Sequence, residues 1–67
     1  MALKIGDRVE YKGEAIDGKY PQGEIIDIGK NRRNFITSYF VKLDVGILVQ
    51  FKPNNLNWRK LEETVSD

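Results

Sequence analysis

The chain has 67 residues, and its eleven Lys and Arg side chains against ten Asp and Glu give a formal net charge of +1. That length allows a single domain with a small hydrophobic core. The sequence has neither cysteine nor histidine, which excludes disulfides and thiolate metal sites and removes the commonest general base and metal ligand.

The distribution of apolar residues limits where the protein can work. No apolar run approaches the ~18 residues that cross a bilayer, and residues 1–6 lack the hydrophobic region of a signal peptide. We therefore expect a soluble, cytoplasmic protein without a transmembrane segment. The near-neutral charge argues against a surface built around a phosphate backbone, because each phosphate contact needs a cation. A local basic patch can still form.

The apolar pattern predicts the first two strands. Residues 5–13 open with a turn and then alternate, so that Val9 and Tyr11 face one side of a half-buried strand. Residues 13–21, with Gly and Pro among charges, form a loop. The second strand covers residues 23–29, where the apolar positions 25, 26 and 28 break strict alternation. This break predicts a bulge or sharp bend near Ile26, of the kind that small barrels need in order to curl.

A hairpin is predicted in the second half of the chain. A polar, basic loop at residues 30–34 precedes a third strand over residues 37–43 and a fourth over residues 47–51. A three-residue loop at residues 44–46, with Gly46 left-handed, puts three cross-strand pairs on one face: Leu43 with Ile47, Val41 with Val49, and Tyr39 with Phe51. A two-residue loop would split this apolar set, so burial favours the longer loop.

The remaining residues complete the predicted fold. Pro53 fixes the start of a single 3₁₀ turn over residues 53–57, and a short last strand follows over residues 58–62. Residues 64–67 are expected to fray. Five short strands with a helical turn before the last predict an all-β, five-stranded SH3-like barrel over residues 1–63. An OB-fold is the main alternative.

Four segments resemble small barrel proteins of photosynthetic complexes. Residues 4–9, 23–28, 40–43 and 58–62 resemble the small O subunit of the NDH-1 complex of cyanobacteria and chloroplasts. The photosystem I subunit PsaE and the cytochrome b6f-associated PetP are similar at the same coarse level. The glycines and apolar residues of segments 23–29 and 39–49 are also similar to NifZ-type proteins, and KOW and Tudor-like nucleic-acid modules share the Gly-x-Ile element. The resemblance implies an accessory subunit, and no cofactor or catalytic residue carries over from these families.

Catalytic patterns are missing from the sequence. It shows no nucleophile–base pair, no phosphate-binding loop and no cluster of residues spaced for a metal. Asp7, Asp27 and Asp44 lie at predicted turns, where an aspartate usually bonds to its own backbone. We therefore expect a protein that is not an enzyme and holds no cofactor.

Protein binding is the function that the predicted register favours. In that register Phe40 and Leu48 point away from the core, with Lys42 and Gln50 beside them. Two large apolar residues on the solvent face of a small domain are explained by an interface, or by the first loop folding over them. The expected partner is a larger protein or membrane-associated complex. The predicted contact residues are Phe40, Leu48, Lys42, Gln50, Trp58, Tyr20, Arg32 and Arg33.

Two further patterns have alternative interpretations. Lys30, Arg32 and Arg33 are followed by Phe35, and this mixture of cations and an aromatic can contact phosphate and stack a base. A nucleic-acid-binding module is therefore the alternative function, with a solvated loop as the simpler interpretation. Tyr20, Pro53 and Trp58 lie near predicted loops and turns, where domains that bind polyproline helices place such residues, but a tryptophan in this position more often covers the core.

Overall fold

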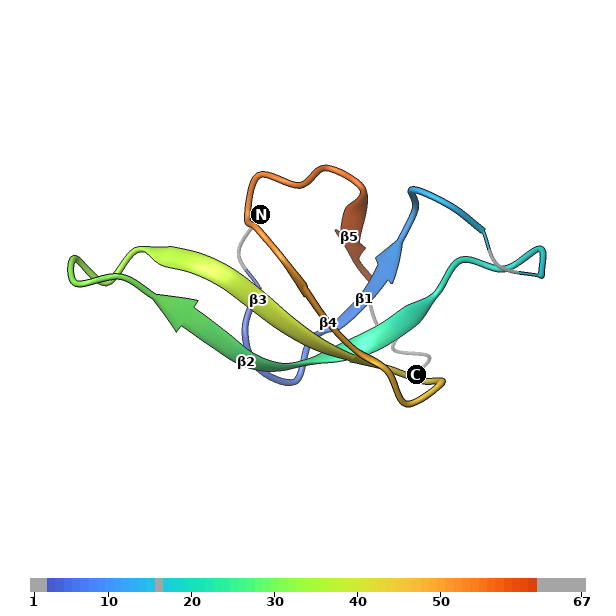
Figure 1. Cartoon of the computed structure of the whole chain (residues 1–67), viewed down its shortest axis with the longest axis horizontal. Helices are drawn as coiled ribbons and strands as arrows, with labels where there is room; N and C mark the ends of the chain where they lie inside the picture. Colours follow the sequence, from blue (N-terminus) through green and yellow to red (C-terminus); the bar gives the residue numbers. More distant parts are fainter. Residues whose placement is uncertain (1–2, 16, 62–67) are drawn as a thin grey trace, which may run out of the picture.

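The computed structural model describes residues 3–15 and 17–61, which form five strands in one antiparallel sheet. The strands are β1 (Arg8–Tyr11), β2 (Gln22–Lys30), β3 (Ile36–Leu43), β4 (Leu48–Phe51) and β5 (Trp58–Lys60). Their order across the sheet is β4-β3-β2-β1-β5 (Figure 1). The described residues contain no helix. The all-β, five-stranded prediction is therefore confirmed, and the topology is consistent with an SH3-like fold.

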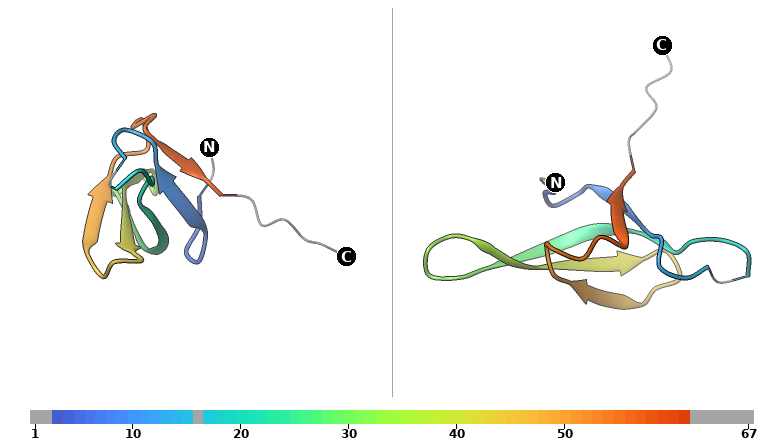
Figure 2. Two further views of the ribbon diagram at one scale, coloured as in Figure 1. Left: turned by 90° about the vertical axis from the view of Figure 1, so that its right-hand side faces the viewer. Right: turned by 90° about the horizontal axis from the view of Figure 1, so that it is seen from above.

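The sheet is curled into a half-barrel. Figure 2 shows β4 and β5 on the two sides of the curl, with the segment between them passing over one end. These two strands are the edges of the sheet and do not pair with each other. The hairpin of β2 and β3 is the longest element, because both strands continue past the ends of β1 and β4. It extends from one side of the molecule in Figure 1.

The curl depends on a bulge in β2, as the broken alternation predicted. Ile25 pairs with Val41, but the next aligned pair joins Asp27 to Phe40, so Ile26 is the extra residue. A bulge adds one residue to a strand and bends it. Asp27 therefore stays on the exposed face, and Ile28 turns inward to pack against the core. The N–H of Ile28 is satisfied by Oδ1 of Asp27 at 2.8 Å.

The core fills the concave side of the sheet. Val9, Ile25 and Val41 are fully buried at its centre, and full burial of such a side chain stabilises the fold by about 1.5–3 kcal/mol. Around them lies a series of aromatic rings. Phe51 stacks on Trp58 with ring centroids 4.6 Å apart and an interplanar angle of 7°. The rings of Tyr39 and Tyr11 extend the series at either end, with centroids 5.2 Å from Phe51 and 5.1 Å from Trp58 respectively.

The predicted hairpin register is confirmed. Gly46 is left-handed with φ of 97°, and the N–H of Leu43 donates to the carbonyl of Ile47 at 2.8 Å. Val41 pairs with Val49 and Tyr39 with Phe51. The expectation that Ile47 is buried with this set is wrong, since 58% of it is exposed. The hairpin end extends past the core, and within residues 3–15 and 17–61 Ile47 is not among the hydrophobic residues that pack against it.

The connection from β4 to β5 differs from the expected 3₁₀ turn. The N–H of Asn55 donates to the carbonyl of Lys52 at 3.0 Å, which closes one turn. The N–H of Asn57 then donates to Oδ1 of Asn55 at 3.0 Å instead of to a backbone carbonyl. This side-chain bond replaces the repeated backbone bonds of a helical turn. β5 ends at Lys60, so the expectation that the strand includes Leu61 is wrong. Residue 62 and the expected frayed tail lie outside the described residues.

Gly23 should not tolerate a side chain. A Cβ there would lie 2.5 Å from the Lys42 carbonyl oxygen and 2.7 Å from Cγ1 of Val41. We expect Gly23→Ala to lower the free energy of unfolding by about 1–3 kcal/mol, because overpacking forces the strands apart. Urea unfolding followed by tryptophan fluorescence measures the change. Gly29→Ala, in the same strand, is the control, since its Cβ would meet no atom closer than 3.4 Å. Equal stability of the two variants would contradict this account of Gly23.

Candidate docking surface

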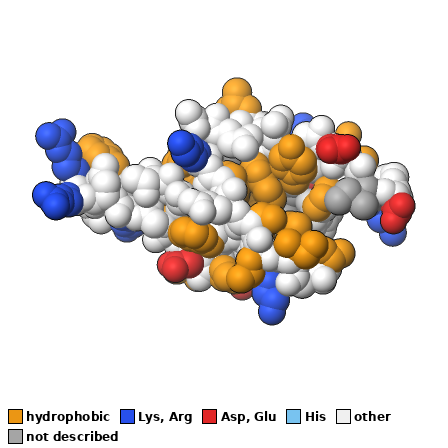
Figure 3. Space-filling model, in the orientation of Figure 1, with side chains coloured by type: hydrophobic (Ala, Val, Ile, Leu, Met, Phe, Trp, Pro, Cys, Tyr) orange, Lys and Arg blue, Asp and Glu red, His pale blue; other side chains and the backbone are white. Residues whose placement is uncertain are grey.

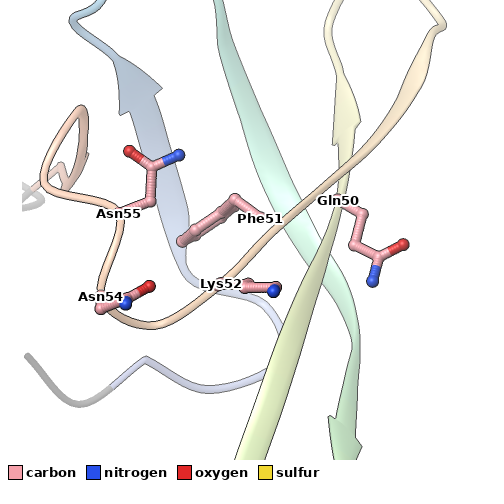
Figure 4. Close-up of a pocket in the computed structure, with 5 residues that line it drawn as sticks. All are labelled: Gln50, Phe51, Lys52, Asn54 and Asn55. Carbon is pink, nitrogen blue, oxygen red and sulfur yellow. The ribbon is translucent and has the colours of Figure 1, made fainter.

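The candidate site is the convex face of the sheet over β2, β3 and β4. Strand alternation places Phe40 and Leu48 on this face, opposite the buried Val41 and Phe51. Lys42 pairs with Leu48 and Gln50 pairs with Phe40 across the hairpin. Figure 4 shows the side chains of Gln50 and Phe51 leaving β4 in opposite directions. Four predicted contact residues are therefore brought together.

The β2 bulge adds a third apolar residue to this face. Ile26 is 42% exposed, and it lines the same shallow pocket as Phe40 and Leu48, which has a volume of about 330 Å³. We call Ile26, Phe40 and Leu48 the outer patch. Leu48 is 66% exposed, whereas Phe40 is only half-buried. Sequence reasoning missed Ile26 as a site residue, although alternation from the buried Ile25 could have placed it on this face.

Polar groups border the outer patch without covering it. Nε2 of Gln50 donates to Oγ of Ser38 at 2.8 Å, which fixes the Gln50 side chain along the hairpin. Lys42 lies opposite Glu24 on β2 and is exposed. Asp27 lines the pocket on the side of the bulge. No residue from the described part of the first loop lines this pocket.

That second groove lies between the first loop and the turn of residues 44–46. Its volume is about 810 Å³, and its apolar lining consists of Tyr20, Pro21, Leu43, Val45 and Ile47. Tyr20 is 45% exposed. Tyr20 therefore contributes to a separate surface from the outer patch. Pro53, which a polyproline site would place beside Tyr20, does not line this groove.

Trp58 is not available as a contact residue. It is only 8% exposed, and its ring is stacked on Phe51 within the concave core. A pocket of about 540 Å³ lies nearby, between the end of β4 and the turn that follows it. Phe51, Asn54 and Asn55 line that pocket (Figure 4). Of the two interpretations of Trp58, the structure supports a core residue.

The basic residues lie at the tip of the β2–β3 hairpin. The tip is a tight loop: the N–H of Asn31 donates to the Phe35 carbonyl at 2.9 Å, and Asn34 is left-handed with φ of 67°. Oδ1 of Asn31 also accepts the N–H groups of Arg33 and Phe35. Lys30, Arg32 and Arg33 are exposed, and so is 63% of Phe35. Figure 3 shows Lys and Arg side chains gathered at this end of the molecule.

Two ion-pair groups stiffen the convex face. Glu10 is only 8% exposed. Its carboxylate accepts hydrogen bonds from Arg59 Nε at 3.0 Å and from Gln22 Nε2 at 3.1 Å, and these bonds link β5, β1 and β2. The guanidinium of Arg8 donates to both oxygens of Asp44 at 2.9 Å and 2.6 Å. These atoms come from β1 and from the turn after β3, and Asp44 also lines the second groove.

Residues 3–15 and 17–61 bring no three Asp or Glu side chains together in an arrangement that could hold a metal ion. Within the same residues, no helix is long and apolar enough to span a membrane.

The Arg8–Asp44 pair should show in an acid titration. Two hydrogen bonds from Arg8 lower the pKa of Asp44 below its ordinary 3.8, because they favour the charged carboxylate. The stabilisation is therefore complete above pH 3.8 and is lost as the pH falls through the lower folded pKa. Carbon NMR of the Asp44 carboxyl should show a midpoint below 3.8 that returns toward the ordinary value in Arg8→Gln. A midpoint unchanged by this substitution would show that the pair does not form in solution.

No protein-family model, no curated protein sequence and no solved structure matches this chain.

Proposed function

We propose that this protein is a non-catalytic accessory or regulatory subunit that docks on a larger protein complex through the outer patch. The observation that carries the proposal is the grouping of the exposed Ile26 and Leu48 with the half-buried Phe40 on one face of a sheet whose other face forms the core. A domain this small has few apolar residues, so leaving two of them exposed beside a half-buried aromatic ring is costly unless a partner covers them.

The surroundings of the outer patch fit a protein partner. Interfaces combine a central apolar cluster with a polar border, and Lys42, Gln50 and Asp27 form such a border here. Arg32 and Arg33, at the hairpin tip, would offer complementary charge to an acidic partner. The second groove, with Tyr20, supplies another contact area. The sequence resemblance to accessory subunits of photosynthetic complexes extends the proposal to a membrane-associated complex as the partner.

Polar substitution within the outer patch should abolish docking. We expect Leu48→Ser and Phe40→Ser each to weaken capture of the partner complex from native extract by about tenfold or more, because buried apolar anchors dominate such interfaces. Quantitative affinity capture, with the far-ultraviolet circular dichroism of each variant as a folding check, measures the loss. Leu56→Ser is the matched control, since Leu56 is 93% exposed on the turn before β5. If both patch variants retain the same partners as the control, the outer patch is not the docking site.

A second candidate function is nucleic-acid binding by the β2–β3 hairpin. The supporting observation is the charge along this hairpin, since residues 28–43 contain Lys30, Arg32, Arg33 and Lys42 but no Asp or Glu. The tip extends beyond the rest of the sheet and exposes Phe35 beside the cations. A two-stranded ribbon fits the major groove of DNA, and an exposed aromatic can stack on an unpaired base.

Nucleic-acid binding has a direct test. We expect the double variant Arg32→Ala/Arg33→Ala to lose most of its affinity for a fluorescent oligonucleotide at about 50 mM salt, because phosphate contacts dominate such binding. Fluorescence anisotropy, with single-stranded and duplex probes, measures it. The control is Lys12→Ala/Lys19→Ala, which removes the same charge from exposed positions elsewhere. Absence of binding by the unmodified protein at low salt would eliminate this second candidate.

A further inference from the structure

The two edges of the sheet are protected to different degrees. β5 has only three residues, and two of them are the cations Arg59 and Lys60. β4 has the sequence Leu-Val-Gln-Phe, without a charged residue or a proline. Charged side chains and prolines are the usual means by which an edge strand avoids pairing with another chain. β4 therefore has the composition of a strand that is meant to be paired.

The hydrogen-bond pattern identifies the free groups of β4. The N–H of Leu43 donates to the Ile47 carbonyl, and bonded and non-bonded pairs alternate along an antiparallel ladder. The backbones of Val49 and Phe51 consequently form hydrogen bonds with those of Val41 and Tyr39. Leu48 and Gln50 lie opposite Lys42 and Phe40 but form no backbone hydrogen bonds with them. The N–H and carbonyl groups of Leu48 and Gln50 thus point away from β3, toward the open edge.

We propose that two copies of this chain pair through their β4 edges to form an antiparallel dimer. The free groups of Leu48 and Gln50 are placed symmetrically about Val49, so Leu48 of each copy can bond to Gln50 of the other around a two-fold axis at Val49. The same register sets Lys52 opposite Gly46, so no like charges face each other. Pairing β5 with a second β5 would instead bring Arg59 and Lys60 of both copies together.

A β4 dimer would also enlarge the convex face. Residues directly opposite in a sheet have side chains on the same side, so Leu48 of each copy would lie beside Gln50 of the other and the two outer patches would meet at the axis. The paired strands have only four residues each. Their contact is therefore smaller than the ~800 Å² per partner of a stable interface, and we expect a weak dimer. This inference goes beyond the proposed docking function and does not depend on it.

Sedimentation equilibrium from about 10 µM to about 1 mM tests the dimer. We expect the average mass to rise from 7.7 kDa toward twice that value. Gln50→Pro should remain at 7.7 kDa throughout, because proline lacks the outward N–H but is tolerated on an edge strand. Gln50→Ala is the matched control, since it also loses the bond to Ser38 but keeps the N–H, and it should associate like the unmodified chain. If Gln50→Pro does not fold, chemically synthesised protein with an N-methyl group at Gln50 replaces it.

Amide hydrogen exchange supplies a residue-level measurement. The amides of Val49 and Phe51 should be protected at every concentration, whereas those of Leu48 and Gln50 should become protected only as the dimer forms. Phe40→Ser should associate normally, so loss of docking and loss of the dimer can be told apart. A chain that stays monomeric at about 1 mM, or a Gln50→Pro variant that associates like Gln50→Ala, would overturn the proposal. In that case the open edge of β4 would be expected to pair with a different protein.

Discussion

The bulge at Ile26 is the constraint on which the rest of this structure depends. Without the extra residue, strict alternation from the buried Ile25 would send Asp27 into the core and Ile28 out to solvent. With it, Asp27 pairs with Phe40 on the convex face, and Ile28 packs against the core opposite Tyr39. The bulge also bends β2. Ile26, which follows the buried Ile25, and Asp27 therefore both lie on the convex face beside Phe40, and the bulge accounts for the curl of the sheet and for the burial of Ile28.

The two faces of the curled sheet are stabilised by different kinds of interaction. The concave side is held by aliphatic burial and by the stacked rings of Phe51 and Trp58. The convex side is held by charged hydrogen bonds, which link β5 to β1 through Glu10 and β1 to the turn after β3 through Arg8 and Asp44. These polar links leave the convex surface over β3 and β4 uncovered, and that uncovered area is the docking surface that we propose. The open edge at β4 adjoins it.

Both hairpins are closed by the same kind of loop, although their sequences look different. In each, three residues lie within the closing backbone hydrogen bond, which joins Leu43 to Ile47 in one hairpin and Asn31 to Phe35 in the other. The third of the three is left-handed: Gly46 and Asn34 respectively. Glycine takes this conformation without strain and asparagine tolerates it, so Gly46 signalled its loop whereas Asn34 did not. The residue that stabilises the β2–β3 loop is Asn31, whose side chain accepts hydrogen bonds from two backbone N–H groups of the loop. A polar, basic run thus forms a defined tip that presents Arg32 and Arg33.

The sequence by itself determined the strands, the hairpin register and the faces on which Phe40 and Leu48 lie, because period-two alternation and a left-handed glycine are local properties. Only the tertiary structure decided what covers each face. Trp58 became a core residue because the curl brings β5 over Phe51, and Ile47 stayed exposed because its hairpin extends past the core. Ile26 lies in one pocket with Phe40 and Leu48 because β3 pairs with β2 on one side and with β4 on the other. Burial depends on contacts between distant segments, and alternation within one strand does not contain that information.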